Sequence, residues 1–428
     1  MKILVINGSP KGDGSVTLQT MLYIQKKFPD HEYSYLNAGL RIKALEKDFS
    51  EAERLLKWAD LLVFIYPVYT FLVPSQLHRF IELIKEKGLD LKGKYATQIS
   101  TSKHFYDITA HEYIRENCED MGLNYITGLS ADMEDLLKKK GQYEAKSFFN
   151  HVLWVAGNEA KKASVKGKRI AVVADYGEED IGLKDMIERF CSRINCDTDV
   201  INLREFDFAG GCLGCFNCAS TGKCIYKDGF DTLLRDRIQT ADATVYAFKI
   251  KDHSMGYRFK VYDDRQFCNG HRTVTMGKPV GYLIDGNLGK ENNLKTLIEA
   301  RAQVGSNYLA GIAESTKDKD KQVDTLVKEL SYVMAKNYNQ PANFYGVGGM
   351  KIFRDLIYKM QGLMKEDHRF YKENGFYDFP QKEKGTILGM YLVGAMMNSG
   401  IAKKHGNKMT EGMLMPYKNI VSKADSNK

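Results

Sequence analysis

The sequence lacks several of the features that assign a protein to a class at once. Met1 leads directly into an apolar run, so we expect no signal peptide and a cytoplasmic location. Residues 385–402 are apolar, but Asn398, Ser399 and four glycines interrupt them, and a transmembrane span of about 20 apolar residues is not expected. Four of the eight cysteines lie within 13 residues. This is unlike a secreted disulfide framework and favours a reducing compartment.

A concentrated basic stripe with base-stacking aromatics is also missing, so we expect no nucleic-acid partner. The net charge is +8, but residues 341–428 hold 14 Lys and Arg against 8 Asp and Glu. This C-terminal part also contains nine of the 17 methionines. We predict a mainly helical extension that packs on the rest of the chain. Covering a site, binding a partner and contacting an anionic membrane surface are the alternatives.

The chain is too long for one ordinary core, and short apolar runs alternate with helical patterns along it. Five strands are predicted in the first part, at residues 2–6, 33–36, 60–66, 95–100 and 124–127. The pattern then restarts, with strands predicted at residues 168–174, 199–203, 243–248, 279–284 and 308–312. Ala59-Asp60 and Ala241-Asp242 precede the third strand of each part.

This alternation predicts an α/β protein with two tandem doubly wound parallel sheets of five strands in the order 2-1-3-4-5. The predicted domains are residues 1–160, residues 168–340 and the extension 341–428. In such a sheet, ligands bind at the carboxyl ends of the strands, beside the point where the strand order reverses.

The first strand is followed by a short polar loop and then by a helix. The loop's N–H groups and the helix N-terminus favour an anion, and Ser9, Ser15 and Thr17 add hydroxyl donors beside Lys11. We therefore predict a phosphate site. The loop matches neither the Walker pattern nor G-x-G-x-x-G, so an ordinary turn capped by Ser15 is the alternative. The corresponding loop 175–180 has four acidic side chains, which would repel a phosphate.

Cys212, Cys215, Cys218 and Cys224 follow the pattern C-x2-C-x2-C-x5-C among several glycines. Thiolates at this spacing suit an Fe–S centre or zinc, and glycines let the backbone approach the sulfur atoms. Successive x2 steps favour a 4Fe–4S cluster. A zinc knuckle and four reduced thiols are the alternatives.

Several of these motifs resemble a known family. Gly8-Ser9-Pro10 with Ser15-x-Thr17, the turn Pro67-Val68-Tyr69, and a helix from Pro74 look like the NADPH-dependent FMN reductases of the flavodoxin-like superfamily. The cysteine stretch, with Asp228 and Asp264-Arg265 after it, resembles the iron–sulfur flavoprotein branch of that family. The resemblance covers about residues 1–340, as two tandem copies. It departs from the family at the second copy, whose phosphate loop is lost and whose P-x-Y turn is replaced by residues 251–256.

The resemblance implies one FMN per chain, held by the first copy. The activity implied is an NAD(P)H-dependent flavin oxidoreductase in which the flavin N5 carries the hydride, so that no side chain acts as a catalytic residue. The cofactor-binding residues implied are Gly8, Ser9, Pro10, Lys11, Gly14, Ser15, Val16, Thr17, Pro67, Val68, Tyr69, Thr70, Ser100, Thr101, Ser102 and Lys103.

The resemblance also implies that a 4Fe–4S cluster on the four cysteines relays electrons to a small-molecule acceptor or a redox protein. In the family, cluster and flavin approach each other across a dimer. We therefore expect either an internal pseudo-dimer or a homodimer. Two alternatives remain open, a non-catalytic electron carrier and a flavin-free scaffold.

Overall fold

A computed structural model describes residues 1–157, 164–398 and 406–424. The chain forms two compact units, Met1–Glu159 with Phe379–Lys428, and Ala160–Asp378. The predicted extension 341–428 is therefore divided in this grouping. Its residues as far as Asp378 belong with the second sheet, and the remainder belongs with the first.

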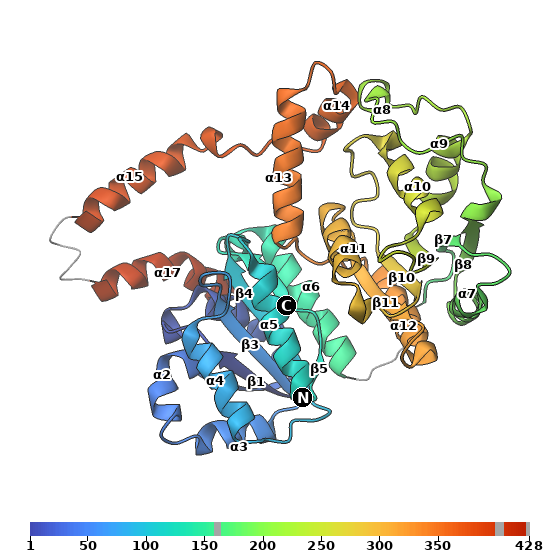
Figure 1. Ribbon diagram of the computed structural model, residues 1–428. Coiled ribbons are helices and arrows are strands. Elements are labelled where there is room, and N and C mark those ends of the chain that lie inside the picture. Colours follow the sequence, from blue (N-terminus) through green and yellow to red (C-terminus); the bar gives the residue numbers. More distant parts are fainter. Residues whose placement is uncertain (158–163, 399–405, 425–428) are drawn as a thin grey trace. The chain divides into compact units, whose positions relative to one another are not determined.

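The first unit is a parallel sheet in the order β2-β1-β3-β4-β5, with β6 also paired to β4 (Figure 1). The strands are β1 (Lys2–Asn7), β2 (Glu32–Leu36), β3 (Leu61–Pro67), β4 (Tyr95–Ser102), β5 (Asn124–Tyr125) and β6 (Leu129–Asp132). The helices are α1 (Val16–Lys27), α2 (Ala38–Leu45), α3 (Ser50–Trp58), α4 (Ser75–Glu86), α5 (Asp107–Asp120) and α6 (Lys139–Ala156). Short 3-10 turns are η1 (Gly12–Gly14) and η2 (Asp135–Leu137).

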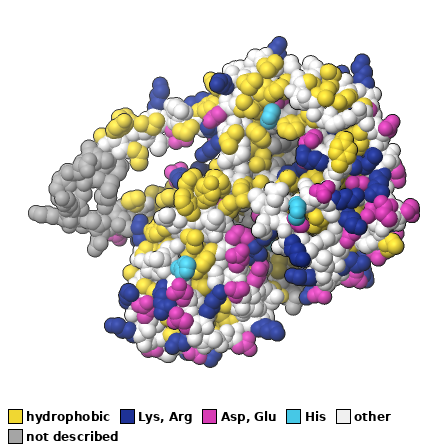
Figure 2. All heavy atoms as spheres, viewed as in Figure 1, with side chains coloured by type: hydrophobic (Ala, Val, Ile, Leu, Met, Phe, Trp, Pro, Cys, Tyr) yellow, Lys and Arg dark blue, Asp and Glu magenta, His cyan; other side chains and the backbone are white. Residues whose placement is uncertain are grey.

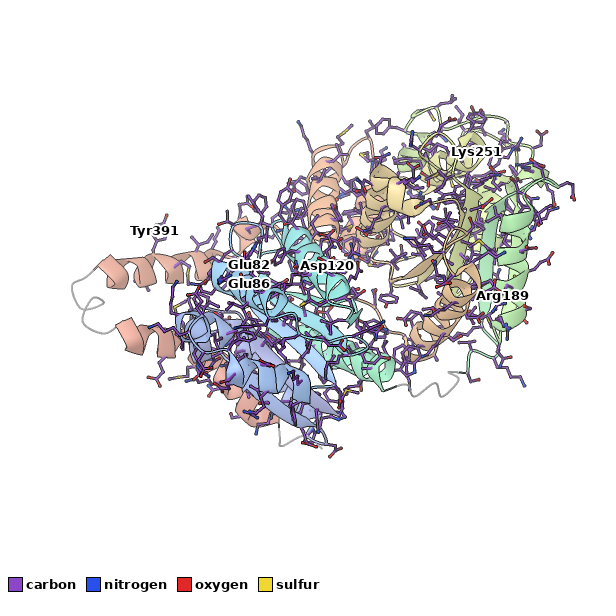
Figure 3. All side chains as sticks on the ribbon, turned by 60° about the horizontal axis from the view of Figure 1, so that its bottom comes forward. Glu82, Glu86, Asp120, Arg189, Lys251 and Tyr391 are labelled. Atoms are coloured by element: carbon purple, nitrogen blue, oxygen red, sulfur yellow. The ribbon has the colours of Figure 1, made fainter. Side chains whose placement is uncertain are left out.

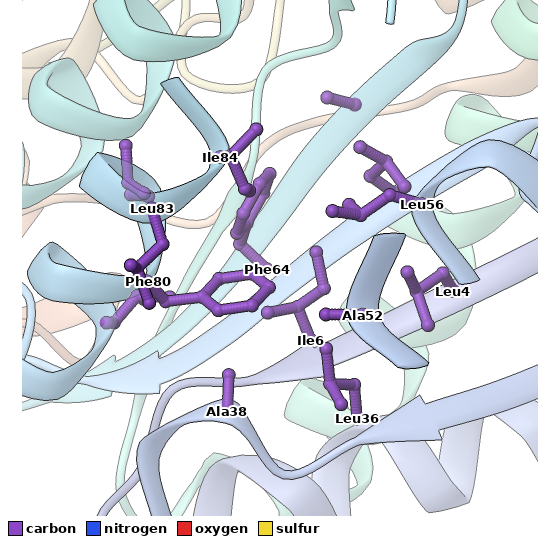
Figure 4. Packing of buried hydrophobic residues seen from close by; sticks show 14 of the residues in the cluster. Leu4, Ile6, Leu36, Ala38, Ala52, Leu56, Phe64, Phe80, Leu83 and Ile84 are labelled. Carbon is purple, nitrogen blue, oxygen red and sulfur yellow. The ribbon is translucent and has the colours of Figure 1, made fainter. Parts of the chain in front are cut away.

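Helices cover both faces of this sheet, and the runs 3–6 of β1 and Leu61–Pro67 of β3 are apolar, as expected of parallel strands buried on both faces. Successive residues point to opposite faces, so Leu4 and Ile6 enter one core cluster while Ile3 and Val5 enter another. Figure 4 shows the first cluster, in which Phe80 of α4 and Phe64 of β3 are completely buried.

Helix α4 is amphipathic, which explains how it packs. Its outer face carries Arg79, whose guanidinium lies 3.0 Å from Glu82 and 2.6 Å from Glu86. Figure 3 labels both acids on the outside of the unit. Burial of Phe80 and its neighbours on the inner face therefore holds this helix, since exposed ion pairs add little.

The second unit has the same strand order, β11-β10-β9-β7-β8, and is again parallel. The strands are β7 (Arg169–Asp175), β8 (Asp197–Asn202), β9 (Ala243–Lys249), β10 (Val280–Asp285) and β11 (Leu309–Glu314). The helices are α7 (Ile181–Arg193), α8 (Asn217–Thr221), α9 (Phe230–Leu233), α10 (Tyr257–Arg265), α11 (Asn292–Val304) and α12 (Lys319–Lys336), with further helical turns η3 (Leu203–Glu205), η4 (Leu234–Ile238), η5 (Gln266–Asn269) and η6 (Leu288–Lys290). The predicted fold class, two doubly wound parallel sheets, is confirmed.

The two Ala-Asp pairs found in the sequence make the same hydrogen bonds in both units. Asp60 accepts from the Lys2 amide at 2.8 Å and donates its own amide to the Lys2 carbonyl. Asp242 makes the same two bonds to Arg169, at 2.9 and 2.8 Å. In each unit, this aspartate fixes where the third strand begins to pair with the first.

Two elements of the first unit differ from the prediction. The fifth strand is split into β5 and β6, which pair with successive parts of β4. Gly128 lies between them against Gln98, where a Cβ atom would come within 2.3 Å of the glutamine side chain. Helix α2 was not predicted. Its Gly39 packs directly on the backbone of Gly8, which a Cβ atom would approach to 2.4 Å.

The C-terminal part is helical. In the second unit α13 (Phe344–Lys359) packs on α11, and α14 (Lys365–Glu373) packs on α8. In the first unit, η7 (Pro380–Lys382) is followed by α15 (Lys384–Asn398) and α17 (Gly406–Lys423). Within the described residues, no helix is long and apolar enough to cross a membrane.

We expect Phe80→Ala to lower the unfolding free energy of the first unit by about 3–5 kcal/mol, because it leaves a cavity in the core. Both tryptophans, Trp58 and Trp154, belong to this unit. Urea unfolding followed by tryptophan fluorescence therefore reports it selectively. Tyr143→Ala on the exposed face of α6 is the control and should change the free energy by less than about 0.5 kcal/mol. Equal effects would contradict the assigned core.

Candidate functional site

The loop after β1 is built as a compact turn that leads into α1. The Ser15 side chain accepts from the Leu18 amide at 3.4 Å and caps the helix. The Asn7 side chain donates to the Gly12 carbonyl at 3.0 Å and accepts from the Ser9 amide at 3.1 Å. These bonds shape the loop at the start of α1, where the first-turn amides that Ser15 does not cap are donors for an anion.

This loop borders a cavity of about 330 Å³ at the carboxyl ends of β1, β3 and β4. The cavity is lined by Ser9, Lys11, Gly14, Ser15, Val16, Thr17, Pro67, Val68, Tyr69, Thr70, Phe71, Thr101, Ser102, Lys103, Phe105 and Met133. Three separate stretches of the predicted set are thus brought together. Phe71, Phe105 and Met133 line the cavity in addition to these residues. Phe71 and Phe105 are aromatic residues close to predicted positions in the sequence, whereas no local pattern marks Met133.

Gly8, Pro10 and Ser100 belong to the predicted set but do not line the cavity. The Gly8 amide donates to the Ile65 carbonyl at 2.8 Å and so continues the ladder between β1 and β3. Ser100 lies 2.8 Å from Nε2 of His111, whose pKa is lowered to about 4 by burial. Gly8 and Ser100 therefore support the cavity from behind.

An aromatic turn forms one wall of the cavity. The Tyr69 and Leu72 amides and carbonyls bond to each other at 2.8 and 3.0 Å, which closes a two-residue turn. The two residues inside it, Thr70 and Phe71, have positive φ values of 48° and 70°. A β-branched residue rarely adopts this conformation. The turn therefore holds strain where it meets the cavity, which is common at ligand sites.

The second wall comes from the loop after β4. The Phe71 ring lies 5.3 Å from the rings of both Phe105 and Tyr106. Behind this loop, the buried Asp107 carboxylate accepts from Ser130 at 2.6 Å and lies 3.0 Å from Nδ1 of His104. The exposed rings are thus carried by a loop that a buried polar cluster holds in place.

The polar groups of the cavity differ in their surroundings. Lys103 lies 2.9 Å from Asp132 and 3.6 Å from Glu134. Burial lowers its pKa, but the bonds to these acids raise it above the ordinary value overall. The hydroxyls of Thr17 and Thr101 are 2.6 Å apart and join the loop to β4. Lys11 makes no ion pair within the described parts of the chain, so its charge is available to an anion.

The corresponding loop of the second unit is filled by a guanidinium group. Arg204, which follows β8, lies 3.1 Å from Asp175, 2.8 Å from Glu179 and 3.0 Å from Asp180. A Cβ atom on Gly177 would come within 1.9 Å of this arginine. The acids are therefore neutralised from within the chain, and the space beside the loop is occupied.

The four predicted metal-ligating cysteines line a second cavity, of about 430 Å³, in the second unit. Cys212 and Cys215 are exposed, while Cys218 and Cys224 are half-buried. Among the described residues, no three His, Cys, Asp or Glu side chains are arranged to hold a metal ion. The thiols share one cavity but are not gathered into a coordination geometry.

The two half-buried cysteines have different polar neighbours. Burial raises the pKa of Cys218 overall, and hydrogen bonds from the Gly270 and Ala219 amides offset this effect only in part. Arg265 interacts with Cys224 and is held by Asp228 through two bonds of 2.8 Å. This buried arginine also donates to the Gly210 carbonyl at 2.8 Å. It therefore ties the start of the cysteine loop to the residues after its end.

Helix α14 fixes the far side of this cavity. The completely buried Asp367 carboxylate accepts from the His271 amide at 3.0 Å and from Arg272 at 3.1 Å. Arg272 also reaches the Cys218 carbonyl at 3.3 Å. A Cβ atom on Gly270 would come within 2.2 Å of Asp367. Asp367, which is 96 positions from His271 in the sequence, thus fixes the turn at Gly270 that faces Cys218.

The fold of the first unit agrees with a family comparison. A family model for the flavodoxin-like fold matches residues 1–133, and no curated protein matches the sequence. Similar solved structures include an NADPH-quinone reductase from P. pentosaceus, with 13% identity over 36% of this chain and 97% of that chain and a TM-score of 0.29.

Two further similar structures carry flavin in their descriptions. General stress protein 14 of Treponema denticola, in complex with FMN, is 14% identical over 37% of this chain and 98% of that chain, with a TM-score of 0.29. An NADH:FMN oxidoreductase in its apo form is 17% identical over 37% and 91%, with a TM-score of 0.32. At these identities and scores, none of these likenesses assigns an activity to this chain.

We expect Arg204→Gln to destabilise the second unit at pH 7 by about 1–3 kcal/mol, because the charged groups beside it lose their partner. The hydrogen bond from Arg204 holds the pKa of Glu179 below its ordinary value. Burial raises the pKa of Asp180, but bonds and nearby cations lower it overall. Carboxylates with lowered pKa values stabilise the fold above the unfolded pKa of about 4 and lose this effect as the pH falls through the folded pKa.

Calorimetry at pH 7 and at pH 3 measures this effect. The difference between wild type and Arg204→Gln should be largest at pH 7 and should shrink at pH 3. Arg237→Gln, which breaks the half-exposed pair with Asp199, is the control and should cost less than about 1 kcal/mol. A difference independent of pH would show that the arginine stabilises the loop by packing alone.

Proposed function

We propose that this protein is an FMN-dependent oxidoreductase that uses NAD(P)H, with FMN bound by the first unit. The observation that carries this proposal is that a hydroxyl-rich loop at a helix N-terminus and an aromatic turn line the same 330 Å³ cavity. The loop suits a phosphate monoester, and the aromatic wall suits a flat ring. Its place at the carboxyl ends of parallel strands is where doubly wound folds bind nucleotides.

Each wall has a distinct task in this proposal. The Ser15 and Thr17 hydroxyls, the first-turn amides of α1 and the Lys11 charge bind the phosphate. The Pro67–Thr70 turn contacts one side of the ring, and residues 101–103 contact the other. Bound FMN supplies the hydride and electron chemistry at its N5 atom, so the chain binds, orients and shields the ring.

The exposed aromatic side chains at the mouth supply a place for a second flat molecule. Tyr69, Phe71 and Phe105 are all at least 42% exposed. A nicotinamide or a small aromatic acceptor would stack here, as aromatic rings do at offset distances of about 4.5–7 Å. Bleaching of the flavin spectrum by NADH or NADPH under anaerobic conditions tests the enzyme against an electron carrier, which would take electrons only from a protein donor.

We expect the double change Ser15→Asp with Thr17→Ala to reduce bound FMN from about one per chain to less than a tenth. Like charge repels the phosphate, and a donor is lost. Flavin released by heat is measured against protein concentration. The matched control, Ser192→Asp with Thr325→Ala, alters two exposed residues of the second unit and should keep the flavin. Equimolar FMN in a folded double variant places the site elsewhere.

We further propose a 4Fe–4S cluster in the second unit, with Cys212, Cys215, Cys218 and Cys224 as ligands. The shared cavity, the amides directed at Cys218 and the arginine at Cys224 support it. Gly211 and Gly214 have open space around them, so the loop can close on a ligand without a steric clash. A bound cluster would pass single electrons to a small-molecule or protein acceptor.

Anaerobically prepared protein should contain about four iron atoms and four sulfides per chain. Cys215→Ser with Cys218→Ser should abolish both, whereas Cys191→Ser, which alters a cysteine outside the cavity, should retain them. Zinc without iron after anaerobic reconstitution would contradict the cluster. The pairing of flavin and cluster, inside one chain or across a homodimer, stays a prediction.

A further inference from the structure

The sequence of helix α15 offers no polar face, although residues 384–392, the part of the helix whose side chains are described, are mostly exposed. Its sequence from Gly385 to Asn398 contains no charged residue. Leu388, Tyr391 and Leu392 are exposed by 64, 76 and 62%. Figure 3 shows Tyr391 pointing away from the helix ribbon, and Figure 2 shows hydrophobic side chains on the described first part of this helix. A helix that is apolar all round is normally buried in protein or in lipid.

The charges around α15 indicate which of these environments fits. Lys382 and Lys384 precede the apolar run, and both are exposed. Residues 379–428 contain eight lysines and three acidic residues, with no acid between Glu383 and Glu411. An apolar segment with flanking lysines complements an anionic lipid surface, where each lysine adds to the attraction. A second copy of the same helix would bring like charges together.

The described length of α15 is too short for a simple span. Fifteen residues extend about 22 Å, whereas the hydrocarbon core of a bilayer is about 30 Å thick. Apolar segments of this length are typical of interfacial or re-entrant elements. The expected mode is therefore insertion into one leaflet.

Helix α17 ties this segment to the unit that holds the first cavity. The Tyr417 hydroxyl donates to the Met133 carbonyl at 3.1 Å, and Lys27 donates to the Ala424 carbonyl at 2.8 Å. Tyr417 and Ala424 also enter a small apolar cluster with Tyr23 and Leu136. Met133 itself lines the cavity. Helix α15 is grouped with the same compact unit, so an inserted α15 brings the unit that holds this cavity to the lipid surface.

We propose that α15 inserts into anionic membrane surfaces and docks the first unit there. Leucine and tyrosine side chains of the helix enter the lipid interface, and Lys382 and Lys384 contact the headgroups. Docking gives the cavity access to apolar molecules dissolved in the bilayer. The binding itself does not depend on flavin or on activity, so it stands or falls separately from the proposed function.

Flotation of the full-length protein with vesicles tests the proposal. We expect the protein to float with vesicles of phosphatidylcholine and phosphatidylserine in equal parts and to float at least tenfold less with phosphatidylcholine alone. Raising the salt concentration should weaken the binding, because the headgroup attraction is screened. Equal flotation with both vesicles, or none with either, overturns the proposal.

Substitutions in and beside α15 then test whether this helix is the part of the chain that binds the vesicles. Leu388→Asp with Leu392→Asp, and separately Lys382→Glu with Lys384→Glu, should each reduce flotation at least tenfold. Ile181→Asp with Tyr257→Asp is the matched control, because both residues are highly exposed apolar positions of the second unit. Tryptophan fluorescence confirms that the first unit remains folded. If the leucine variant abolishes self-association of the chain but leaves flotation unchanged, the helix binds a second copy and the proposal is wrong.

Discussion

The parallel ladder between β1, β3 and β4 is the constraint on which the first cavity depends. It brings the ends of three strands to one edge, although the loops that follow them lie far apart in the sequence. The bonds continue past the strands, from the Gly8 amide to Ile65 and from the Val68 amide to Thr101 at 3.2 Å. A shift in register would separate the loop, the aromatic turn and the β4 loop, and no change within one loop could restore the cavity.

The second unit has the same scaffold as the first, but different side chains at the corresponding edge of its sheet. The turn Lys251–Ser254 is closed by two bonds of 2.9 Å, and Asp252 and His253 have positive φ values of 48° and 60°. It thus repeats the Tyr69–Leu72 turn with different side chains. Lys278 donates to the Ala241 carbonyl as Lys94 donates to that of Ala59. What differs is the first loop, where an arginine among acids takes the place of hydroxyls around an open cavity.

Sequence periodicity was sufficient for the sheets because the first and third strands of each unit are buried and mostly apolar. The strand order and the position of the loop followed from this pattern together with the rules for parallel crossovers. Helix α2 was not predicted because it has only eight residues and its buried face includes a glycine, which is a poor helix former. Its helical form depends on packing against Gly8, which is a tertiary contact. The split of the fifth strand likewise follows from the close approach of Gly128 to Gln98.

Residues of the two candidate sites could be predicted where a single short stretch of sequence contains several of the functional groups. The loop 8–17 and the cysteine spacing meet this condition, whereas Met133 and Asp367 do not. Their partners, Tyr417 and His271, are 284 and 96 positions away, and no local pattern reports such pairs. Both contacts involve the C-terminal segment that follows the sheets. Helix α14 contacts the border of the cysteine cavity, and α17 contacts the border of the first cavity. The C-terminal segment therefore helps to shape the cavity of each unit. Composition could indicate that this segment is helical, but it could not indicate which distant residues the segment contacts.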